Sequence, residues 1–313
     1  MRDACGRTIT YLRISVTDLC NYRCRYCMPE SGVEKQSHSA VCSFEELREM
    51  AQAAVNCGVR KIRVTGGEPL VRRGIVDFCR MLKEIDGVEE LCLTTNGSLL
   101  PDLARPLRDA GVDRLNISLD TLRPDRFRRI TRLGTLEDVL QGIQAAEAAG
   151  FTHLKINCVL LGGINDDEIR DFIDLTRTKP WQIRFIERMP MGDGCDFGDY
   201  LPAQAVLDCC PQLEKIPNEG VAALYHLPGA PGTVGLITPM SHDFCARCSR
   251  IRITADGRLK PCLHSESEIP LRGLTGPDLA RAIGSGILAK PPQHHLNTDG
   301  ITQTHRAMNQ IGG

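Results

Sequence analysis

The sequence has no excess charge of either sign and no long apolar run, and both absences narrow its function. Lys and Arg together number 38 and Asp and Glu together number 39, so the overall charge gives no sign of a polyanionic partner such as nucleic acid. No run approaches the roughly eighteen apolar residues that span a bilayer. The opening Met1–Cys5 is not a charged head followed by an apolar signal core. We therefore expect a cytoplasmic protein that binds neither nucleic acid nor a membrane.

Cysteine is abundant, and three cysteines stand close together near the start of the chain. The 313 residues include 15 cysteines, which in a reducing compartment favours metal or cluster binding over a disulfide framework. Cys20, Cys24 and Cys27 have the spacing Cys-x3-Cys-x2-Cys. Three thiolates this close can hold one face of a cubane iron–sulfur cluster and leave its fourth iron without a protein ligand.

Zinc is the alternative occupant of this first triad. A structural zinc site usually has four protein ligands, and no fourth Cys or His follows within ten residues, so the spacing favours a cluster. With Tyr26 before its last cysteine, the triad resembles the signature of the radical S-adenosylmethionine enzymes. In these enzymes the amino and carboxylate groups of the cofactor bind the open iron.

Strand-like and helix-like runs alternate from about residue 10 to 190, in units of roughly thirty residues. The predicted strands occupy residues 10–16, 59–65, 88–94, 113–119, 153–160 and 181–186. A helix is predicted over 44–56, where Ser43 and Glu46 form a capping box. Six such units predict an α/β fold, an incomplete (β/α)6 barrel with its helices outside. We expect residues 1–190 to form this partial barrel and residues 191–313 to cover its open side.

Polar and apolar residues alternate along the predicted strands, although parallel strands covered by helices are usually apolar throughout. In the first strand Arg13 and Ser15 share one face, and Leu12 and Ile14 share the other. Because the outer face must meet apolar helices, we predict that the polar face lines a cationic interior suited to an anionic ligand with several charges. The alternative, an exposed basic face, fits six repeated units poorly.

Distinctive residues follow the strands at their C-terminal ends, where barrels of this type bind ligands. The first triad follows the first strand, and Gly66-Gly67-Glu68 follows the second. Paired glycines let the backbone approach a ligand closely, although alone they are equally consistent with a tight turn. About forty residues after the triad, they resemble the radical S-adenosylmethionine motif that contacts the methionyl amino group. By this resemblance the cofactor contacts are Tyr26, Gly67, Ser118 and Met189.

A second group of three cysteines lies near the C-terminus: Cys245, Cys248 and Cys262. A β-hairpin with its turn at Asp256-Gly257 is predicted between the last two, and it would bring Cys262 back toward Cys248. The alternation places Arg250 and Arg252 on one face, beside the metal. The alternative occupant is a zinc ion with His264 or His242 as fourth ligand.

The two triads, Arg250-Ile251-Arg252, Phe185-Ile186-Glu187 and the terminal Ile311-Gly312-Gly313 resemble the GTP 3',8-cyclase family of molybdenum-cofactor biosynthesis over nearly the whole chain. The second triad and the diglycine tail are the most specific parts of this resemblance. It implies a radical S-adenosylmethionine lyase with two 4Fe-4S clusters, one on each triad. Such an enzyme converts GTP to (8S)-3',8-cyclo-7,8-dihydroguanosine 5'-triphosphate, the first step of that pathway.

The resemblance also implies roles for individual residues. In this family the second cluster binds the guanine, and basic residues of the interior hold the triphosphate. The matching substrate-binding positions are Arg13, Lys61, Arg63, Thr94, Lys155, Arg184, Arg250 and Arg252. The expected catalytic residues are Arg13, Lys155, Arg252, Gly312 and Gly313. The first three orient the substrate and stabilise charge, while the diglycine tail reaches into the site.

The expected reaction and partners follow from the same resemblance. A 5'-deoxyadenosyl radical takes hydrogen from C3' of the ribose, and the resulting carbon radical attacks C8 of the guanine. A reductant such as flavodoxin supplies the electron, and the product passes by diffusion to a pyranopterin synthase. The chain itself is expected to be a monomer or a homodimer.

Two other functions are compatible with parts of the sequence. A radical S-adenosylmethionine enzyme that modifies peptides also has C-terminal cysteines, but it would not need so many arginines in its interior. A zinc-binding scaffold or regulatory protein would use both triads as structural sites. Iron and sulfide uptake distinguishes this last alternative from the enzymes.

Overall fold

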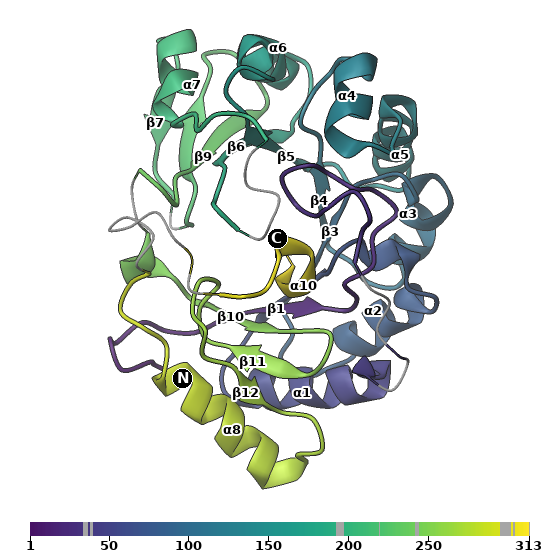
Figure 1. The fold of residues 1–313 in the computed structure, drawn as a ribbon, viewed down its shortest axis with the longest axis vertical. Helices are drawn as coiled ribbons and strands as arrows, with labels where there is room; N and C mark the ends of the chain where they lie inside the picture. Colours follow the sequence, from purple (N-terminus) through teal and green to yellow (C-terminus); the bar gives the residue numbers. More distant parts are fainter. Residues whose placement is uncertain are drawn as a thin grey trace.

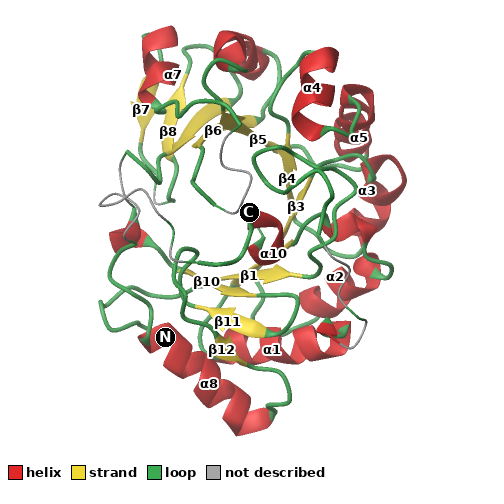
Figure 2. Cartoon of the chain, in the orientation of Figure 1, coloured by secondary structure: helices red, strands yellow, loops and turns green. Residues whose placement is uncertain are grey.

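The computed structural model describes residues 1–33, 37, 40–191, 197–218, 220–241, 244–294, 302 and 304–312. Strands surround a central space, and most of the helices lie outside them (Figure 1). Figure 2 shows the same arrangement by secondary structure, with the helices forming an outer layer around the strands. Among the described residues, no helix has the length and apolar character needed to cross a membrane.

Six strand–helix units build the first part of the chain, as the alternation predicts. The strands are β1 (Tyr11–Ser15), β2 (Lys61–Thr65), β3 (Glu90–Thr95), β4 (Arg114–Ser118), β5 (Lys155–Leu160) and β6 (Gln182–Glu187). The helices between them are α1 (Phe44–Asn56), α2 (Ile75–Lys83), α3 (Leu100–Asp109), α4 (Pro124–Thr131), α5 (Leu136–Ala148) and α6 (Ile169–Asp174). Each predicted strand overlaps the observed one and differs from it by at most two residues at either end.

Helix α1 shows how local sequence sets an element. The Ser43 hydroxyl accepts a hydrogen bond from the Glu46 amide, and the Glu46 carboxylate accepts one from the Ser43 amide, so the predicted capping box is confirmed. This box satisfies amide groups that have no partner within the helix. Leu47, Met50 and Ala51 then face the sheet, one helical turn apart, and are buried.

The rest of the chain adds strands to both edges of this sheet. Its elements are α7 (Gln204–Cys209), β7 (Glu214–Ile216), β8 (Ala223–His226), β9 (Thr233–Ile237), β10 (Arg250–Ile253), β11 (Arg258–Lys260), β12 (Ile269–Pro270), α8 (Gly276–Leu288) and α10 (Met308–Ile311). The sheet order is β12-β11-β10-β1-β2-β3-β4-β5-β6-β9-β8-β7. Strand β10 pairs parallel with β1, and β9 pairs parallel with β6.

The expected open α/β barrel is therefore confirmed, with one extra parallel strand on each edge. The order has two ends, β12 and β7, and no pairing joins them within the described part of the chain. The division of the chain at residue 190 stays a prediction, because this continuous sheet does not test it.

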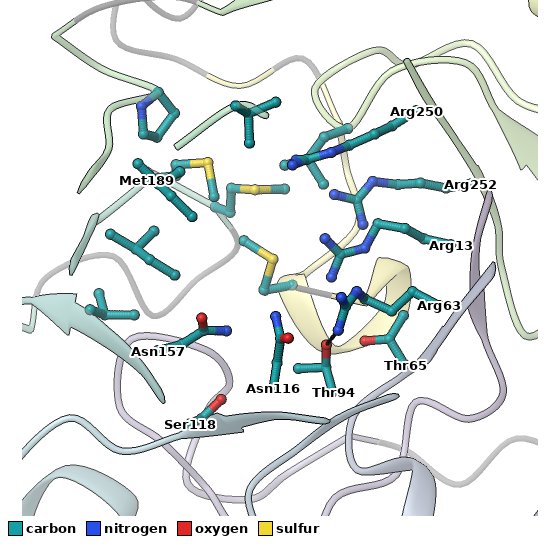
Figure 3. A pocket seen from close by; sticks show the side chains of 18 of the residues that line it. Arg13, Arg63, Thr65, Thr94, Asn116, Ser118, Asn157, Met189, Arg250 and Arg252 are labelled. Atoms are coloured by element: carbon teal, nitrogen blue, oxygen red, sulfur yellow. Dashed lines mark hydrogen bonds between the residues drawn. The ribbon is translucent and has the colours of Figure 1, made fainter. Parts of the chain in front are cut away.

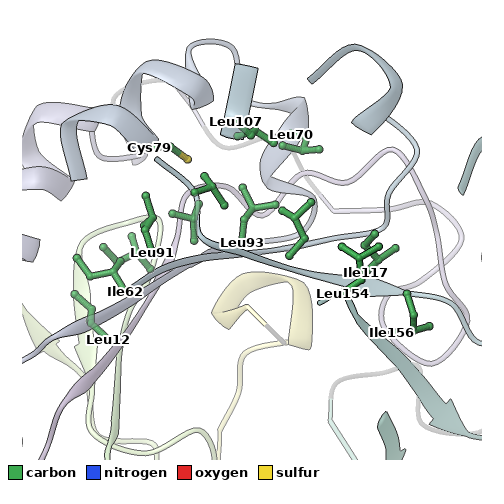
Figure 4. Close-up of a cluster of buried hydrophobic side chains, with 14 of the residues drawn as sticks. Leu12, Ile62, Leu70, Cys79, Leu91, Leu93, Leu107, Ile117, Leu154 and Ile156 are labelled. Carbon is green, nitrogen blue, oxygen red and sulfur yellow. The ribbon is translucent and has the colours of Figure 1, made fainter. Parts of the chain in front are cut away.

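The core lies between the strands and the outer helices, as Figure 4 shows. Leu12, Ile62, Leu93 and Ile117 come from four neighbouring strands, point to this side and are fully buried. Burying such a side chain contributes about 1.5–3 kcal/mol. Because neighbouring residues of a strand point to opposite faces, this apolar outer face leaves the polar residues on the inner one.

Candidate active site

A cavity of about 480 Å³ lies within the curved sheet and brings both cysteine triads together. Its wall includes all six predicted cluster ligands, Cys20, Cys24, Cys27, Cys245, Cys248 and Cys262. It includes the four predicted cofactor contacts, Tyr26, Gly67, Ser118 and Met189. It also includes the eight predicted substrate contacts, Arg13, Lys61, Arg63, Thr94, Lys155, Arg184, Arg250 and Arg252. The structure thus places these residues around one space, while their roles stay predictions.

The two triads approach the cavity from opposite ends of one pair of strands. The first triad follows the C-terminal end of β1, and Cys248 lies just before the N-terminal end of β10. These strands run parallel, with Arg13 beside Arg252. The predicted hairpin is confirmed, since β10 and β11 pair antiparallel and thereby direct Cys262 back toward Cys248. The guanidinium groups between the triads therefore belong to neighbouring strands.

The first triad lies in a tight loop of free thiols. The amide groups of Cys27 and Met28 both donate to the carbonyl oxygen of Cys24, at 2.9 and 3.1 Å. Burial raises the pKa of Cys20 to about 11 and that of Cys27 to about 12. Burial also raises the pKa of Cys24, and the charge of Cys27 adds to this effect. The thiolate forms of these cysteines repel one another. A group that carries positive charge and takes thiolate ligands, as an iron–sulfur cluster does, would relieve this repulsion.

The second triad has the same donor set in a more positive environment. The three cysteines carry thiols and not disulfides, and Cys245 begins a short 3-10 turn, Cys245–Arg247. Burial would raise the pKa of Cys248, but the charges of Lys290 and Arg250 outweigh it and lower this pKa. Thiolate formation is therefore easier at Cys248 than at the thiols of the first triad. Both donor sets fit a cluster, and no three His, Cys, Asp or Glu side chains in the described ranges are grouped to hold a single metal ion.

The two histidines of the zinc alternative differ in what the structure shows. His264 lines the cavity, and its ring packs edge-to-face against His294, with 5.2 Å between the ring centroids. Burial, assisted by the charge of His294, lowers the pKa of His264 to about 3, so this imidazole is neutral near pH 7. His242 lies outside the described residues.

One wall of the cavity is a row of guanidinium groups. Figure 3 shows Arg250, Arg252, Arg13 and Arg63 side by side, all directed into the same space. Arg63 donates from Nη1 to the hydroxyl of Thr94 at 3.1 Å. Burial and repulsion by Arg250 lower the pKa of Arg252 to about 10. Such crowding of like charges is costly without an anion, so the wall is suited to a polyanionic ligand.

Three further basic side chains, those of Arg184, Lys155 and Lys61, line the cavity. Burial lowers the pKa of Arg184 to about 10 and that of Lys155 to about 7, and neighbouring cations strengthen both shifts. Lys61 forms an ion pair with Glu90, which also pairs with Arg114. The predicted basic residues therefore line the interior of the sheet, as the strand alternation indicates.

Two buried carboxyl groups hold the first triad's surroundings in place. Glu68 accepts hydrogen bonds from the amides of Leu70 and Asn96, at 3.0 and 2.6 Å, and burial raises its pKa to about 7. Asp120 accepts from the hydroxyl of Tyr26 at 2.7 Å, and burial raises its pKa to about 6. Glu68 thus fixes the loop after β2, while Asp120 orients the tyrosine of the triad.

Helix α10, near the C-terminus, lies inside the curve of the sheet (Figure 1). Arg252 donates from Nη1 to the carbonyl oxygens of Ile311, at 3.1 Å, and Gly312. Gly312 has φ of +70°, and a Cβ there would lie 2.2 Å from Cγ2 of Thr65. Only glycine fits this contact and this backbone conformation. Gly313 lies outside the described residues.

Several residues of the site are not predicted from the sequence. Tyr11 lies at the N-terminal end of β1, and its hydroxyl accepts a hydrogen bond from Nε of Arg63. The strand alternation could have identified Tyr11, since it shares a face with Arg13. Glu187 and Lys290 also line the cavity. Their roles depend on partners far away in the chain, which no local pattern reveals.

Comparisons with known proteins give family matches over most of the chain. A model of the Radical SAM superfamily matches residues 14–176, and a model named Molybdenum Cofactor Synthesis C matches residues 181–296. The chain is 47% identical over 320 residues to the GTP 3',8-cyclase of Alkaliphilus oremlandii, covering 100% of both chains. It is 50% identical over 319 residues to the GTP 3',8-cyclase of Peptoclostridium acidaminophilum, covering 99% of this chain and 98% of that protein.

A solved structure shares the fold at low sequence identity. Streptococcus suis SuiB bound to S-adenosylmethionine superposes with a TM-score of 0.65 at 14% identity, covering 89% of this chain and 68% of that one. At this identity the likeness shows the open-barrel fold alone. Family membership follows from the full-length relatives and the two family models: the chain belongs to the radical SAM superfamily and, within it, to the GTP 3',8-cyclase family.

Proposed function

We propose that this protein is a lyase that joins C3' of the GTP ribose to C8 of the guanine, the first step of molybdenum-cofactor biosynthesis. One observation carries the proposal: two cysteine triads line a single cavity, and a row of guanidinium groups lies between them. A cavity of about 480 Å³ is within the usual range for a bound small molecule. The full-length similarity to proteins named GTP 3',8-cyclase supports the same substrate.

The charges of the cavity favour a nucleoside triphosphate. Arg13 and Arg63 lie on the neighbouring strands β1 and β2, and Lys155 and Arg184 lie on the neighbouring strands β5 and β6. All four residues line the same cavity. Each charge-assisted hydrogen bond to a phosphate contributes about 1.5–3 kcal/mol, so four such groups hold a triphosphate firmly and orient its ribose. Lys61 and Thr94 extend this surface, and Arg250 and Arg252 extend it toward the second triad.

The proposed cofactors are two 4Fe-4S clusters and S-adenosylmethionine. Cys20, Cys24 and Cys27 would hold the first cluster, and the second triad would hold the other. Tyr26, Gly67, Ser118 and Met189 would contact S-adenosylmethionine, which with the first cluster supplies a 5'-deoxyadenosyl radical when bound. Cβ atoms at Gly66 and Gly67 would lie 2.5 Å and 2.4 Å from backbone oxygens of Thr17 and Leu19. This loop can therefore pack closely only with glycine.

The chain's own residues would control where bonds form. Arg13, Lys155 and Arg252 would hold the substrate still and stabilise charge while C3' and C8 approach one another. Arg252 also holds the backbone of Ile311 and Gly312, so the diglycine tail and the substrate depend on one guanidinium group.

Further parts of the proposal concern the surroundings of the enzyme. We place it in the cytoplasm as a monomer or homodimer, with a reductant such as flavodoxin as electron donor. Its product would pass to a pyranopterin synthase by diffusion. Residues 1–190 would form the catalytic barrel, and residues 191–313 would carry the second cluster and close the open side.

Anaerobic reconstitution with iron and sulfide tests the proposal. We expect about eight irons per chain, falling to about four when either triad is changed to alanine. With reductant, S-adenosylmethionine and GTP, the reconstituted protein should form 5'-deoxyadenosine and the cyclised nucleotide. Zinc in both triads without iron uptake, or no cleavage of S-adenosylmethionine in the presence of GTP, would overturn the proposal.

A further inference from the structure

Two further buried cations, Arg7 and Lys290, lie beside the second triad. Arg7 belongs to the segment before β1, and Lys290 follows α8. The side chain of Arg7 is 7% exposed, and Lys290 is 4% exposed as a residue. Buried charges of this kind need several partners to offset the loss of hydration.

Arg7 uses its guanidinium group to join three parts of the chain. From Nη1 it donates to the carbonyl oxygens of Cys245 and Pro292, both at 2.9 Å. From Nη2 it donates to Pro291 at 2.7 Å and to Lys290 at 3.4 Å. The N-terminal segment, the first cysteine of the triad and the segment after α8 therefore meet at one side chain.

Arg7 is itself held in place by Asp3. The Asp3 carboxylate accepts from Nε of Arg7 at 2.6 Å, and from the amides of Cys5 and Arg7 at 2.9 Å. The Asp3 side chain is fully buried. The guanidinium group is thus oriented from one side, and its remaining N–H groups reach the carbonyl oxygen of Cys245 and those of residues 290–292.

Lys290 connects the other two cysteines. Its ammonium group donates to the carbonyl oxygens of Arg250 and Pro261, both at 2.8 Å, and to the thiol of Cys248. Pro261 precedes Cys262 directly in the chain. One cation therefore fixes the strand after Cys248 and the residue before Cys262.

We propose that Arg7 and Lys290 are positioning residues of the second triad, which hold its three thiols in the arrangement that receives a cluster. Arg7 acts on Cys245, and Lys290 acts on Cys248 and Cys262. The inference rests on the proposed function, since it assumes that this triad binds iron and sulfide. Residues that orient metal ligands in this way typically change metal affinity by about 10- to 100-fold when removed.

The test uses the full chain with Cys20, Cys24 and Cys27 changed to alanine, so that all bound iron reports on the second triad. In this background we compare Arg7→Met and Lys290→Met. The readouts are iron per chain after anaerobic reconstitution, the rate of iron loss to a chelator, and the EPR spectrum of the reduced cluster. We expect iron loss to be about tenfold faster or more in both variants, with an altered spectrum.

Conservative and matched variants separate positioning from folding. Lys290→Arg keeps a cation and should restore most of the retention of iron, whereas Arg7→Lys, with one donor group instead of a fork, should restore less. Asp3→Asn leaves Arg7 in place but weakens its orientation, so it should give a smaller effect than Arg7→Met. It tests the role of Arg7 if Arg7→Met fails to fold. Arg108→Met is the control, because Arg108 also donates to backbone carbonyls, those of Val112 and Asp113.

The outcomes distinguish this inference from the proposed function. Iron uptake by the background together with unchanged iron loss in both methionine variants would overturn the inference alone. An equal effect in Arg108→Met would also overturn it, since the loss would then reflect general destabilisation. No iron uptake by the background would overturn the proposed second cluster, and the inference with it.

Discussion

The side-chain amide of Asn309 donates to the carbonyl oxygen of Asp18 at 3.0 Å, across 291 positions of the chain. Asp18 lies two residues before the first triad, and Asn309 lies in α10. The backbone amide of Asn309 also donates to the thiol of Cys27. The end of the chain is therefore attached to the loop of the first triad as well as to Arg252. Its position depends on both ends of the cavity.

Gly312→Ala should lower the rate of GTP cyclisation at least about tenfold while the melting temperature changes little. The added Cβ would collide with Thr65, so the tail must leave the cavity. The measurement is the rate of product formation by reconstituted enzyme. Gly273→Ala is the control, because Gly273 has φ of +80° but no atom within 4 Å of the added Cβ. Equal losses in both variants would show that backbone strain, and not the Thr65 contact, is responsible.

Arg63→Met should weaken GTP binding by about 10- to 100-fold. This estimate corresponds to the loss of a charge-assisted contact worth about 1.5–3 kcal/mol. Arg63 is buried, and its partners Thr94 and Tyr11 hold it toward the cavity. Calorimetric titration with GTP measures the effect. Arg114→Met is the matched control, since Arg114 is half-exposed and pairs with Glu90 outside the cavity wall. A similar loss in both variants would indicate a general effect of charge.

The affinity for GTP should fall as pH rises from 7 to 9, because of Lys155. Burial and the charges of Arg184 and Lys61 lower the pKa of Lys155 to about 7, so the free protein loses this proton as pH rises. A bound triphosphate favours the charged form, and binding above pH 7 therefore takes up a proton. Titration calorimetry in two buffers of different ionisation enthalpy measures this uptake. Lys155→Arg should abolish this proton uptake. If the uptake persists in this variant, another group takes up the proton.

The lowered pKa of Lys155 also makes the free energy of unfolding depend on pH. Because the folded pKa of Lys155 lies below the unfolded value of about 10.4, the folded state binds fewer protons between these two values. The contribution of this lysine to the free energy of unfolding should therefore rise with pH from about 7 to about 10. Denaturant unfolding of wild type and Lys155→Met at pH 7 and pH 9 tests this. The stability gained by wild type should exceed that gained by the variant.

Glu187→Ala should destabilise the fold by about 3 kcal/mol. The carboxylate is fully buried and accepts hydrogen bonds at 3.0 Å from the amides of Ala203, Met240 and Ser241. Removing it leaves these donors without their acceptor, at a cost of about 1–3 kcal/mol for each buried group. Denaturant unfolding measures the change, with the exposed Glu214→Ala as control. A change below about 1 kcal/mol would show that water replaces the carboxylate.

The barrel and the composition of the cavity wall can be predicted from the sequence because both depend on short-range periodicity. Arg13, Arg63 and Lys155 are identified by alternation within a single strand, and the structure places all three at the cavity. The parallel pairing of β10 with β1 cannot be predicted in this way, since it joins residues more than two hundred positions apart. The contacts of Arg7 join segments equally distant in the chain, those of Lys290 reach back to β10, and those of Glu187 reach residues after β9, so they are also missed.

The attachment of the two triads to opposite ends of neighbouring strands sets how far apart the two groups of thiols lie. Strand β1 has five residues, and at about 3.3 Å per residue its backbone spans about 13 Å from first to last Cα. The length of a ligand that could reach both triads at once therefore depends on strand length as well as on the arginines along the wall.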